Sequence, residues 1–257
     1  MSLLATSTTN IKAQPETVAL FISDLHLSPD TPHTVAAFFK FLQHEATRAT
    51  YLYLLGDLFE YWPGDDDIDS AFAQQICQEL KRVAELGTQL FWMGGNRDFL
   101  VGPAFAAAAG MTLLSEPHIA DLGEQKILLV HGDAQCTDDT AYMAFRSTVR
   151  NTEWQTAFLA RPLAERKSII ASMRQGSREA QKEKSMEIMD VNTDEIAALF
   201  KSHHVELLIH GHTHRPGIHA SPEGMRYVLP DWDCESDTKR GGWIALDSEG
   251  DLHQVNL

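Results

Sequence analysis

The sequence predicts an α/β fold, and three observations indicate it. Short apolar runs rich in β-branched and aromatic residues alternate with longer amphipathic stretches, as strands alternate with helices. Five of these runs are followed directly by polar residues and glycines, which is typical of loops at the carboxyl edge of an open sheet. The composition is that of a globular chain, because 44% of its 257 residues are hydrophobic and 22% are charged.

The predicted elements follow in a regular order. Strands are predicted for eight apolar runs, at residues 18–23, 51–55, 89–93, 126–130, 206–209, 226–229, 243–246 and 251–255. Between the first three runs, apolar residues at helical spacing predict helices at 33–48 and 70–86, and Gly87 ends the second one. We expect one domain at 17–257, preceded by a flexible polar lead-in at 1–16 that lacks the features of a signal peptide.

A long helical segment interrupts this alternation at about residues 138–200. It has no convincing strand, and we expect it to be an insertion in the domain. Residues 146–184 hold nine basic residues against four acidic ones. Apolar and basic side chains are interleaved here, namely Phe158, Leu159, Leu163, Ile169, Ile170 and Met173 with Arg161, Arg166, Lys167 and Arg174. This pattern predicts a helix with an apolar and a basic face, which suits the surface of an anionic membrane.

The composition argues against several classes of protein. The 21 Lys and Arg and 36 Asp and Glu give a formal net charge of −15, which argues against a nucleic-acid partner. No apolar run reaches the roughly 18–20 residues of a membrane-spanning helix. The three cysteines are widely spaced and form no CxxC pair, so we expect reduced thiols in a cytoplasmic protein.

The polar clusters after five predicted strands contain the residues best suited to chemistry. They read Asp24-Leu25-His26, Gly56-Asp57, Gly95-Asn96-Arg97-Asp98, His131-Gly132-Asp133 and Gly211-His212-Thr213-His214. Because the carboxyl ends of strands meet at one edge of an α/β sheet, residues far apart in the sequence can converge there. Carboxylate, imidazole and carboxamide donors without thiolates suit a divalent ion such as Mn²⁺, Mg²⁺, Fe²⁺ or Zn²⁺.

The number of these donors indicates two metal ions. The predicted ligands are Asp24, His26 and His214 for one ion and Asn96, His131 and His212 for the other, with Asp57 as the bridge. Two ions about 3.5–4 Å apart can activate a water molecule and neutralise a phosphoryl oxygen during an in-line displacement. Asp98, Asp133 and Thr213 are expected to orient these ligands. We expect His210 to be buried and hydrogen-bonded, and the acidic run at 65–67 to be a solvated loop.

The order of the motifs resembles that of the calcineurin-like metallophosphoesterases. The motifs are D-x-H, GD, GNxD, H-G-D and GHTH, and the resemblance covers the chain from about residue 20 to residue 257, apart from the helical segment. It implies a four-layer α/β/β/α sandwich, in which two mixed sheets pack face to face and helices cover the outside. It also implies that the helical segment is a cap over the metal ions.

A closer resemblance is to the UDP-2,3-diacylglucosamine hydrolases, the pyrophosphatases of lipid A biosynthesis in Gram-negative bacteria. It is carried by the stretches SDLHLSPD, LGDLFEYWPGDDD, GGNRDFL, HGDAQCTDDTAYMAFR, KSMEIMDVN and LIHGHTHRP. It implies hydrolysis of UDP-2,3-diacylglucosamine to UMP and 2,3-diacylglucosamine 1-phosphate by water that attacks the α-phosphorus, with two Mn²⁺ ions as cofactors. It further implies a protein bound peripherally to the cytoplasmic face of the inner membrane, without a stable protein partner.

The same resemblance implies roles for individual residues. The implied catalytic residues are Asp57, Asn96, Arg97 and His212, and the implied substrate contacts are Asn96, Arg97, Asp139, Ser177, Gln181, Lys184 and His212. The cap would receive the acyl chains of the substrate. The chain departs from the family pattern at Gln181, where relatives have Asn, and at Pro230, where Gly is expected.

Arg97 favours a diphosphate substrate on chemical grounds. General metallophosphatases carry His at this position, whereas a guanidinium stays charged and cannot act as a general acid near neutral pH. A phosphate-monoester leaving group is stable as an anion and needs no proton, and a guanidinium can bind the additional phosphate charge. The alternative for Arg97 is a structural salt bridge with Asp98.

Two other functions stay open at the level of sequence. One is a different metal-dependent phosphoesterase on the same scaffold, such as a nucleotide-sugar or cyclic-nucleotide hydrolase. The other is a binding module that keeps the fold without catalysis. The complete set of predicted metal ligands favours an enzyme, because a scaffold has no need of an intact site for two metal ions.

Overall fold

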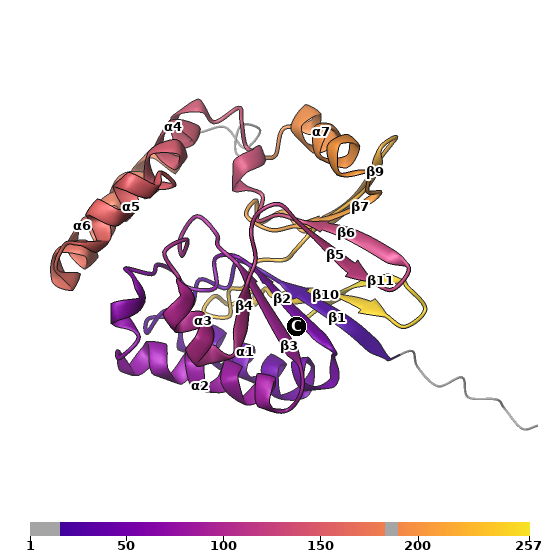
Figure 1. Cartoon of the computed structure of the whole chain (residues 1–257), viewed down its shortest axis with the longest axis horizontal. Coiled ribbons are helices and arrows are strands. Elements are labelled where there is room, and N and C mark those ends of the chain that lie inside the picture. Colours follow the sequence, from indigo (N-terminus) through magenta and orange to yellow (C-terminus); the bar gives the residue numbers. More distant parts are fainter. Residues whose placement is uncertain (1–15, 183–189) are drawn as a thin grey trace, which may run out of the picture.

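Two mixed β-sheets form the centre of the computed structural model, which describes residues 16–182 and 190–257, without the side chains of 176–182 (Figure 1). The first sheet has six strands in the order β11-β10-β1-β2-β3-β4, and the second has five in the order β5-β6-β7-β9-β8. The first comprises β1 Thr17–Ile22, β2 Tyr51–Leu55, β3 Gln89–Met93, β4 Met111–Leu113, β10 Gly242–Asp247 and β11 Leu252–Asn256. The second comprises β5 His118–Leu122, β6 Gln125–Leu129, β7 Leu207–His210, β8 Gly217–Ser221 and β9 Gly224–Val228.

The alternation of side chains along the central strands buries both faces of each sheet. In β1, Ala19 and Phe21 pack into the core between the two sheets, while Leu20 and Ile22 pack into the core under the outer helices. β2 and β6 divide their side chains between two cores in the same way. Strands buried on both faces are expected to be apolar throughout, and this explains the uninterrupted apolar runs of the sequence.

Helices cover the outer face of each sheet. The first sheet is covered by α1 Pro32–His44, α2 Ala71–Glu85 and α3 Pro103–Ala109, and the second by α7 Thr193–His203. Two of these helices begin where a side chain accepts hydrogen bonds from exposed backbone amides, at Ser70 for α2 and at Asn192 for α7. The predicted four-layer α/β/β/α sandwich is therefore confirmed.

Three further helices, α4 Thr140–Val149, α5 Thr152–Leu159 and α6 Leu163–Lys182, lie together beside the sandwich (Figure 1). Phe158 is buried in the core of the first sheet, and Trp154, Ile169 and Ile170 pack against the same core. We call α4, α5 and α6 the cap. The helix α7 also falls in the segment predicted as an insertion, but Ile196 and Phe200 pack it onto the second sheet.

Several elements differ from the sequence prediction. The predicted helix at 33–48 divides into α1 and a short 3₁₀ helix, η1 Ala46–Arg48. The helix α3 and the strands β4, β5 and β8 were not predicted: β4 has only three residues, β5 is an edge strand with only two buried residues, and the edge strand β8 is largely exposed. The predicted lead-in lies outside the described residues except for Glu16. In the described ranges, no helix has the length and apolar character needed to cross a membrane.

Candidate metal centre

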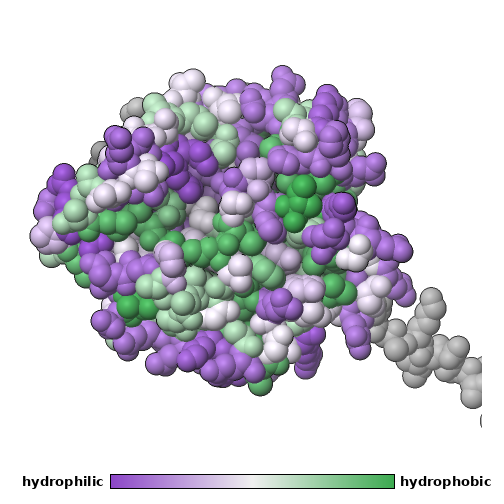
Figure 2. Space-filling view, in the orientation of Figure 1, coloured by the Kyte–Doolittle hydropathy of each residue, from purple (hydrophilic) through white to green (hydrophobic). Residues whose placement is uncertain are grey.

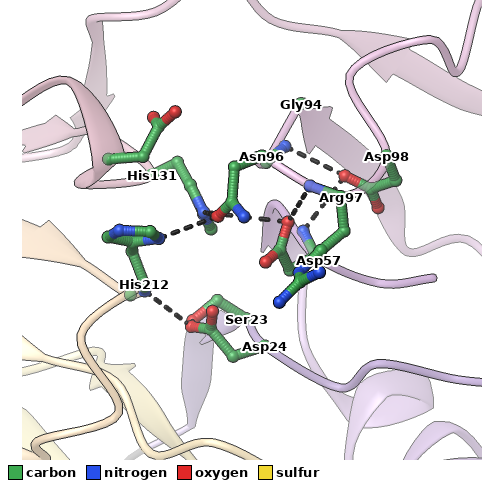
Figure 3. A network of polar contacts seen from close by, with 12 residues as sticks. Ser23, Asp24, Asp57, Gly94, Asn96, Arg97, Asp98, His131 and His212 are labelled. Atoms are coloured by element: carbon green, nitrogen blue, oxygen red, sulfur yellow. Dashed lines mark hydrogen bonds and ion pairs between the residues drawn. The ribbon is translucent and has the colours of Figure 1, made fainter. Parts of the chain in front are cut away.

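Loops from both sheets bring the seven predicted metal ligands together at the carboxyl ends of the strands. Asp24 and His26 follow β1, Asp57 follows β2, Asn96 follows β3, His131 follows β6, and His212 and His214 follow β7. Figure 3 shows the side chains of Asn96, His131 and His212 converging, with Asp24 and Asp57 beside them. Parallel strands in each sheet deliver these loops to the same place, as the motif positions predict.

The backbone of these loops is held in an unusual conformation. Five predicted ligands have positive φ angles, namely Asp24 at 55°, His26 at 48°, Asp57 at 53°, His212 at 66° and His214 at 53°. Such residues are uncommon outside glycine and concentrate at functional sites, where the surrounding structure compensates for their conformational energy. Here the amides of Leu25 and His26 both donate to the carbonyl oxygen of Asp57, at 2.9 and 3.0 Å.

The polar atoms fall into two groups that could each bind a cation. Ligand atoms of Asp24, His26 and His214 lie within 4.8 Å of one another, as do those of Asp24, Asp57 and His131. Asp24 belongs to both groups, and Asp57 also contacts both, because its Oδ2 is 3.9 Å from His26 Nε2 and its Oδ1 is 3.8 Å from His131 Nε2. Asp24 Oδ1 is buried without a hydrogen-bond partner among the described residues, which suits a metal ligand. The residues present therefore fit a pair of divalent cations.

Asn96 links the imidazoles of His131 and His212. Its Oδ1 lies 3.0 Å from His131 Nε2 and 2.8 Å from His212 Nδ1 (Figure 3). A hydrogen bond on the side of the ring away from Asn96 orients His131, since its Nδ1 lies 2.8 Å from the carbonyl oxygen of Leu55 and can donate to it. A Cβ atom on Gly56, whose φ is +90°, would approach that Nδ1 to 2.6 Å, so the chain requires glycine there.

Asp98 holds two of the ligand loops with a single carboxylate. It accepts hydrogen bonds from the amides of Asp57 at 3.1 Å, Leu58 at 2.8 Å, Phe59 at 3.2 Å and Gly95 at 3.0 Å. Burial and the neighbouring charge of Asp57 raise the pKa of Asp98 to about 7. The salt bridge considered for Arg97 and Asp98 is absent among the described residues.

The buried groups change each other's protonation. Burial alone would raise the pKa of Asp24, but the nearby imidazoles, above all His214, hold it well below the usual range. Burial would lower the pKa of His131, but the carboxylates of Asp57 and Asp24 raise it to about 9. Burial and the charge of His131 lower the pKa of His212 to about 4. The cluster thus concentrates anionic oxygens at a place from which most water is excluded, and divalent cations favour such a site.

A cavity of about 900 Å³ joins this centre to the underside of the cap. His26, Asp57, Asn96, Arg97, His212 and His214 line its polar end. Its apolar end is lined by Phe99, Leu100, Phe145, Val149, Trp154, Phe158, Ile170 and Met173. Figure 2 shows hydrophobic residues gathered beside the cap and across the middle of this face. The cavity is therefore suited to a ligand with one charged and one apolar end.

The predicted substrate contacts are only partly described. Asn96, Arg97, His212 and Asp139 line the cavity, and Asp139 also caps α4 by accepting from the amide of Tyr142 at 3.0 Å. The side chains of Ser177 and Gln181 lie outside the described residues, as does Lys184. His210 is fully buried, as predicted, and its ring lies 2.8 Å from the carbonyl oxygen of Gly211 and 3.0 Å from Arg226.

Sequence reasoning missed several residues around the centre. Tyr142 and Arg146 both donate to the buried carboxylate of Asp133, at 2.6 and 2.9 Å. The acidic run is not a solvated loop, because Asp65 accepts from three amides at the start of α3 and its neighbours pair with the cap. Glu60 also lies next to His26, with its Oε2 3.1 Å from His26 Nδ1, and no local pattern in the sequence indicates this contact.

Comparison with known proteins agrees with this geometry. The family model for calcineurin-like phosphoesterases matches residues 18–216. A protein of Aromatoleum aromaticum named UDP-2,3-diacylglucosamine hydrolase is 49% identical over 221 residues, covering 83% of this chain and 89% of the relative. Proteins of the same name from Chromohalobacter salexigens and Klebsiella pneumoniae are 47% and 48% identical and cover 83% and 84% of this chain, and 88% and 91% of the relatives. The chain therefore belongs to the calcineurin-like phosphoesterase family and, within it, to the UDP-2,3-diacylglucosamine hydrolases.

Proposed function

We propose that the protein hydrolyses the pyrophosphate bond of UDP-2,3-diacylglucosamine to give UMP and 2,3-diacylglucosamine 1-phosphate, a step of lipid A biosynthesis. The single observation that carries the proposal is the cavity, which joins a centre rich in metal ligands to an apolar chamber under the cap. A substrate with a diphosphate at one end and acyl chains at the other matches both parts. The names of the relatives at 47–49% identity support the same substrate.

Two Mn²⁺ ions are the proposed cofactors. Asp24, His26 and His214 would hold one ion and Asn96, His131 and His212 the other, with Asp57 between them. Bound there, the ions would activate a water molecule and neutralise charge on the phosphoryl oxygens. The mixture of imidazole and carboxylate donors without thiolate is compatible with Mn²⁺.

Arg97 is proposed to bind the diphosphate. It lines the cavity, and its buried Nε has no hydrogen-bond partner among the described residues, so the guanidinium can donate to a phosphate oxygen. Its amide donates to Asp57 Oδ1 at 2.8 Å, which fixes the start of the side chain beside the metal centre. The leaving phosphate monoester departs as an anion, and a fixed cation stabilises that charge as it develops.

The cap is proposed to bind the acyl chains. Eight apolar side chains line its end of the cavity, and four of them lie on α4 or α5: Phe145, Val149, Trp154 and Phe158. We further propose that the segment at about 138–200 is an insertion in a domain that spans 17–257. The helices α4, α5 and α6 would then cover the substrate, while α7 completes the sandwich.

Peripheral association with the cytoplasmic face of the inner membrane is part of the proposal. The cap exposes three large apolar side chains, with Phe145 and Leu159 each 42% and Met173 38% accessible. Three of the basic residues that suggested membrane binding pair instead with acidic residues of the sandwich, namely Arg166, Lys167 and Arg174. Apolar contact would therefore dominate, and flotation with vesicles should depend more on α4 and α5 than on anionic lipid.

One assay tests the proposed reaction. UMP release from UDP-2,3-diacylglucosamine is measured in detergent with Mn²⁺ and with EDTA, beside UDP-N-acetylglucosamine and an aryl phosphate as soluble substrates. We expect metal-dependent release of UMP from the diacylated substrate alone. Cleavage of the soluble substrates alone would instead indicate a different phosphoesterase with the same metal centre.

A further inference from the structure

The cap helix α6 is fastened to one short segment of the sandwich, residues 60–67. Among the side chains that the structure describes, three ion pairs join them, namely Arg166 with Asp66, Lys167 with Asp67 and Arg174 with Glu60. The side chain of Arg166 is only 1% exposed, and it also donates to the carbonyl oxygen of Pro63. A Cβ atom on Gly64 would lie 2.4 Å from Arg166 Nη1 and 2.7 Å from Leu159 Cδ2, so the two parts are in close contact.

Glu60 differs from the other two acidic partners because it also contacts a predicted metal ligand. Its Oε1 pairs with Arg174, and its Oε2 lies 3.1 Å from His26 Nδ1. The other ring nitrogen of His26 faces the metal centre, 3.2 Å from His214 Nε2. One carboxylate therefore has the cap on one side and a metal ligand on the other.

The geometry around His26 makes the position of Glu60 important. The 3.1 Å separation is that of an ion pair, but it lacks the alignment of a regular hydrogen bond. The backbone of Glu60 is fixed, since its amide donates to the carbonyl oxygen of Leu27 at 3.1 Å. Arg174 pairs with the carboxylate and so contributes to its position, and the guanidinium also lies over the ring of Tyr61, 5.6 Å from its centroid.

A carboxylate behind a metal-binding histidine is known to orient the ring and to increase metal affinity. We propose that Glu60 is a positioning residue that connects the docked cap to His26, so that cap docking and metal binding at His26 strengthen each other. The inference rests on the proposed metal centre. Because coupling between two equilibria is reciprocal, metal binding must stabilise the docked cap by the same factor by which the docked cap increases metal affinity.

The decisive variants are Arg174→Met and Glu60→Gln, measured in the full-length protein after removal of metal. Arg174 contacts no predicted metal ligand among the described residues, so weaker metal binding in its variant is expected to act through Glu60, because loss of a cation from the cavity would by itself favour a bound metal ion. Titration calorimetry with Mn²⁺ should show about tenfold weaker binding for both variants, the effect known for residues behind metal ligands. The matched control is Asp67→Asn, which removes an ion pair between the same elements without contacting a ligand and should keep the wild-type affinity.

Hydrogen exchange supplies a readout that does not depend on activity. Adding Mn²⁺ to the wild type should slow amide exchange in α6 at residues 163–175, and this protection should be lost in Glu60→Gln and kept in Asp67→Asn. Equal Mn²⁺ affinity in the wild type and Arg174→Met would overturn the inference while leaving the proposed function intact. A wild-type protein that binds no Mn²⁺ would overturn the proposed metal centre and the inference with it.

Discussion

The metal centre and the cap both face the cavity, yet different interactions hold them in place. At the metal centre the positions of the loops depend mainly on the backbone, because five predicted ligands have positive φ angles and the buried carboxylate of Asp98 accepts hydrogen bonds from four amides. The cap is attached by side chains, through ion pairs and an apolar seam around Phe158. The metal centre is therefore rigid, whereas the attachment of the cap can be changed by replacing single side chains.

Exposure separates the two regions further. Asp24, Asp57, Asp98 and His131 are almost completely buried, so their interactions act in a medium of low dielectric constant. The acidic partners of the cap are more accessible, and the side chain of Asp66 is 59% exposed. Accessible ion pairs contribute about 0–1 kcal/mol each, so the pair of Lys167 and Asp67 is not expected to dominate the attachment of the cap, in contrast to the buried guanidinium of Arg166.

The largest effect is expected at the metal centre from Asp57→Asn. Loss of the bridging charge should lower kcat/KM at least about a thousandfold, because the metal pair supplies several kcal/mol of transition-state stabilisation. The thermal midpoint should stay the same or rise, since the charge of Asp57 destabilises the ionised form of Asp98. Steady-state kinetics and calorimetry check both. If the variant keeps a tenth of the wild-type kcat/KM, Asp57 does not bridge the two metal ions. If its thermal midpoint is lower than that of the wild type, Asp57 supports the fold.

The pH dependence of metal binding should be the next largest effect. His131, with a pKa raised to about 9, carries a proton at neutral pH that a metal ion must displace, whereas His212, with a pKa lowered to about 4, does not. Affinity for Mn²⁺ should therefore fall about tenfold per pH unit from pH 8 to pH 6. Calorimetry in buffers of different ionisation enthalpy would detect the released proton. An affinity independent of pH in this range would contradict the assigned protonation of His131.

A smaller effect is expected at the cap from Gly64→Ala. The new Cβ would overlap Arg166 and Leu159, and such overpacking costs about 1–3 kcal/mol. The KM for the diacylated substrate should rise about tenfold, the equivalent of about 1.4 kcal/mol. Gly87→Ala is the matched control, because Gly87 also has a positive φ, +111°, but has no atom within 4 Å of the new Cβ. If both variants raise KM alike, backbone strain and not contact with the cap would be responsible.

The smallest effect is expected from Lys167→Gln, which removes one accessible ion pair of the cap. Denaturant unfolding should give a free energy within about 1 kcal/mol of the wild type, and the difference should shrink further at high salt. If the free energy of unfolding fell by several kcal/mol, the difference described between the metal centre and the cap would be wrong, because a single ion pair would then dominate the attachment of the cap.

The metal centre was predictable because its signals are local. Each motif follows an apolar run directly, and the rule that strand ends share one edge brings Asp24, Asp57 and Asn96 together at the first sheet. His131 belongs to the second sheet, and the packing of the two sheets brings it to the same place. The helix α3, which was not predicted, also has local signals, with Pro103 at its start and Gly110 in a left-handed conformation just after its end. The four layers came from resemblance and not from periodicity.

The attachment of the cap could not be predicted, because it depends on partners far apart in the sequence. Arg166 was interpreted as part of a basic face, but its partner Asp66 lies 100 residues earlier. Asp65 caps α3 through amides 37 to 40 residues later, which no local pattern in the acidic run reveals. Charge composition indicates only that such pairs are possible, and which of them form depends on how the cap packs against the sandwich, where Phe158 is buried in the core.

The positive φ angles of Asp24, His26, Asp57, His212 and His214 constrain how the loops can change over evolution. Asn, Asp and His are the non-glycine residues that best tolerate this conformation, and Asp and His are also metal ligands. Loop shape and metal chemistry therefore favour the same residues, and a β-branched replacement would disturb both. Descendants that lost catalysis but kept the fold are expected to carry Asn or Gly at these five positions. Their loops would then keep the same backbone conformation without binding metal ions.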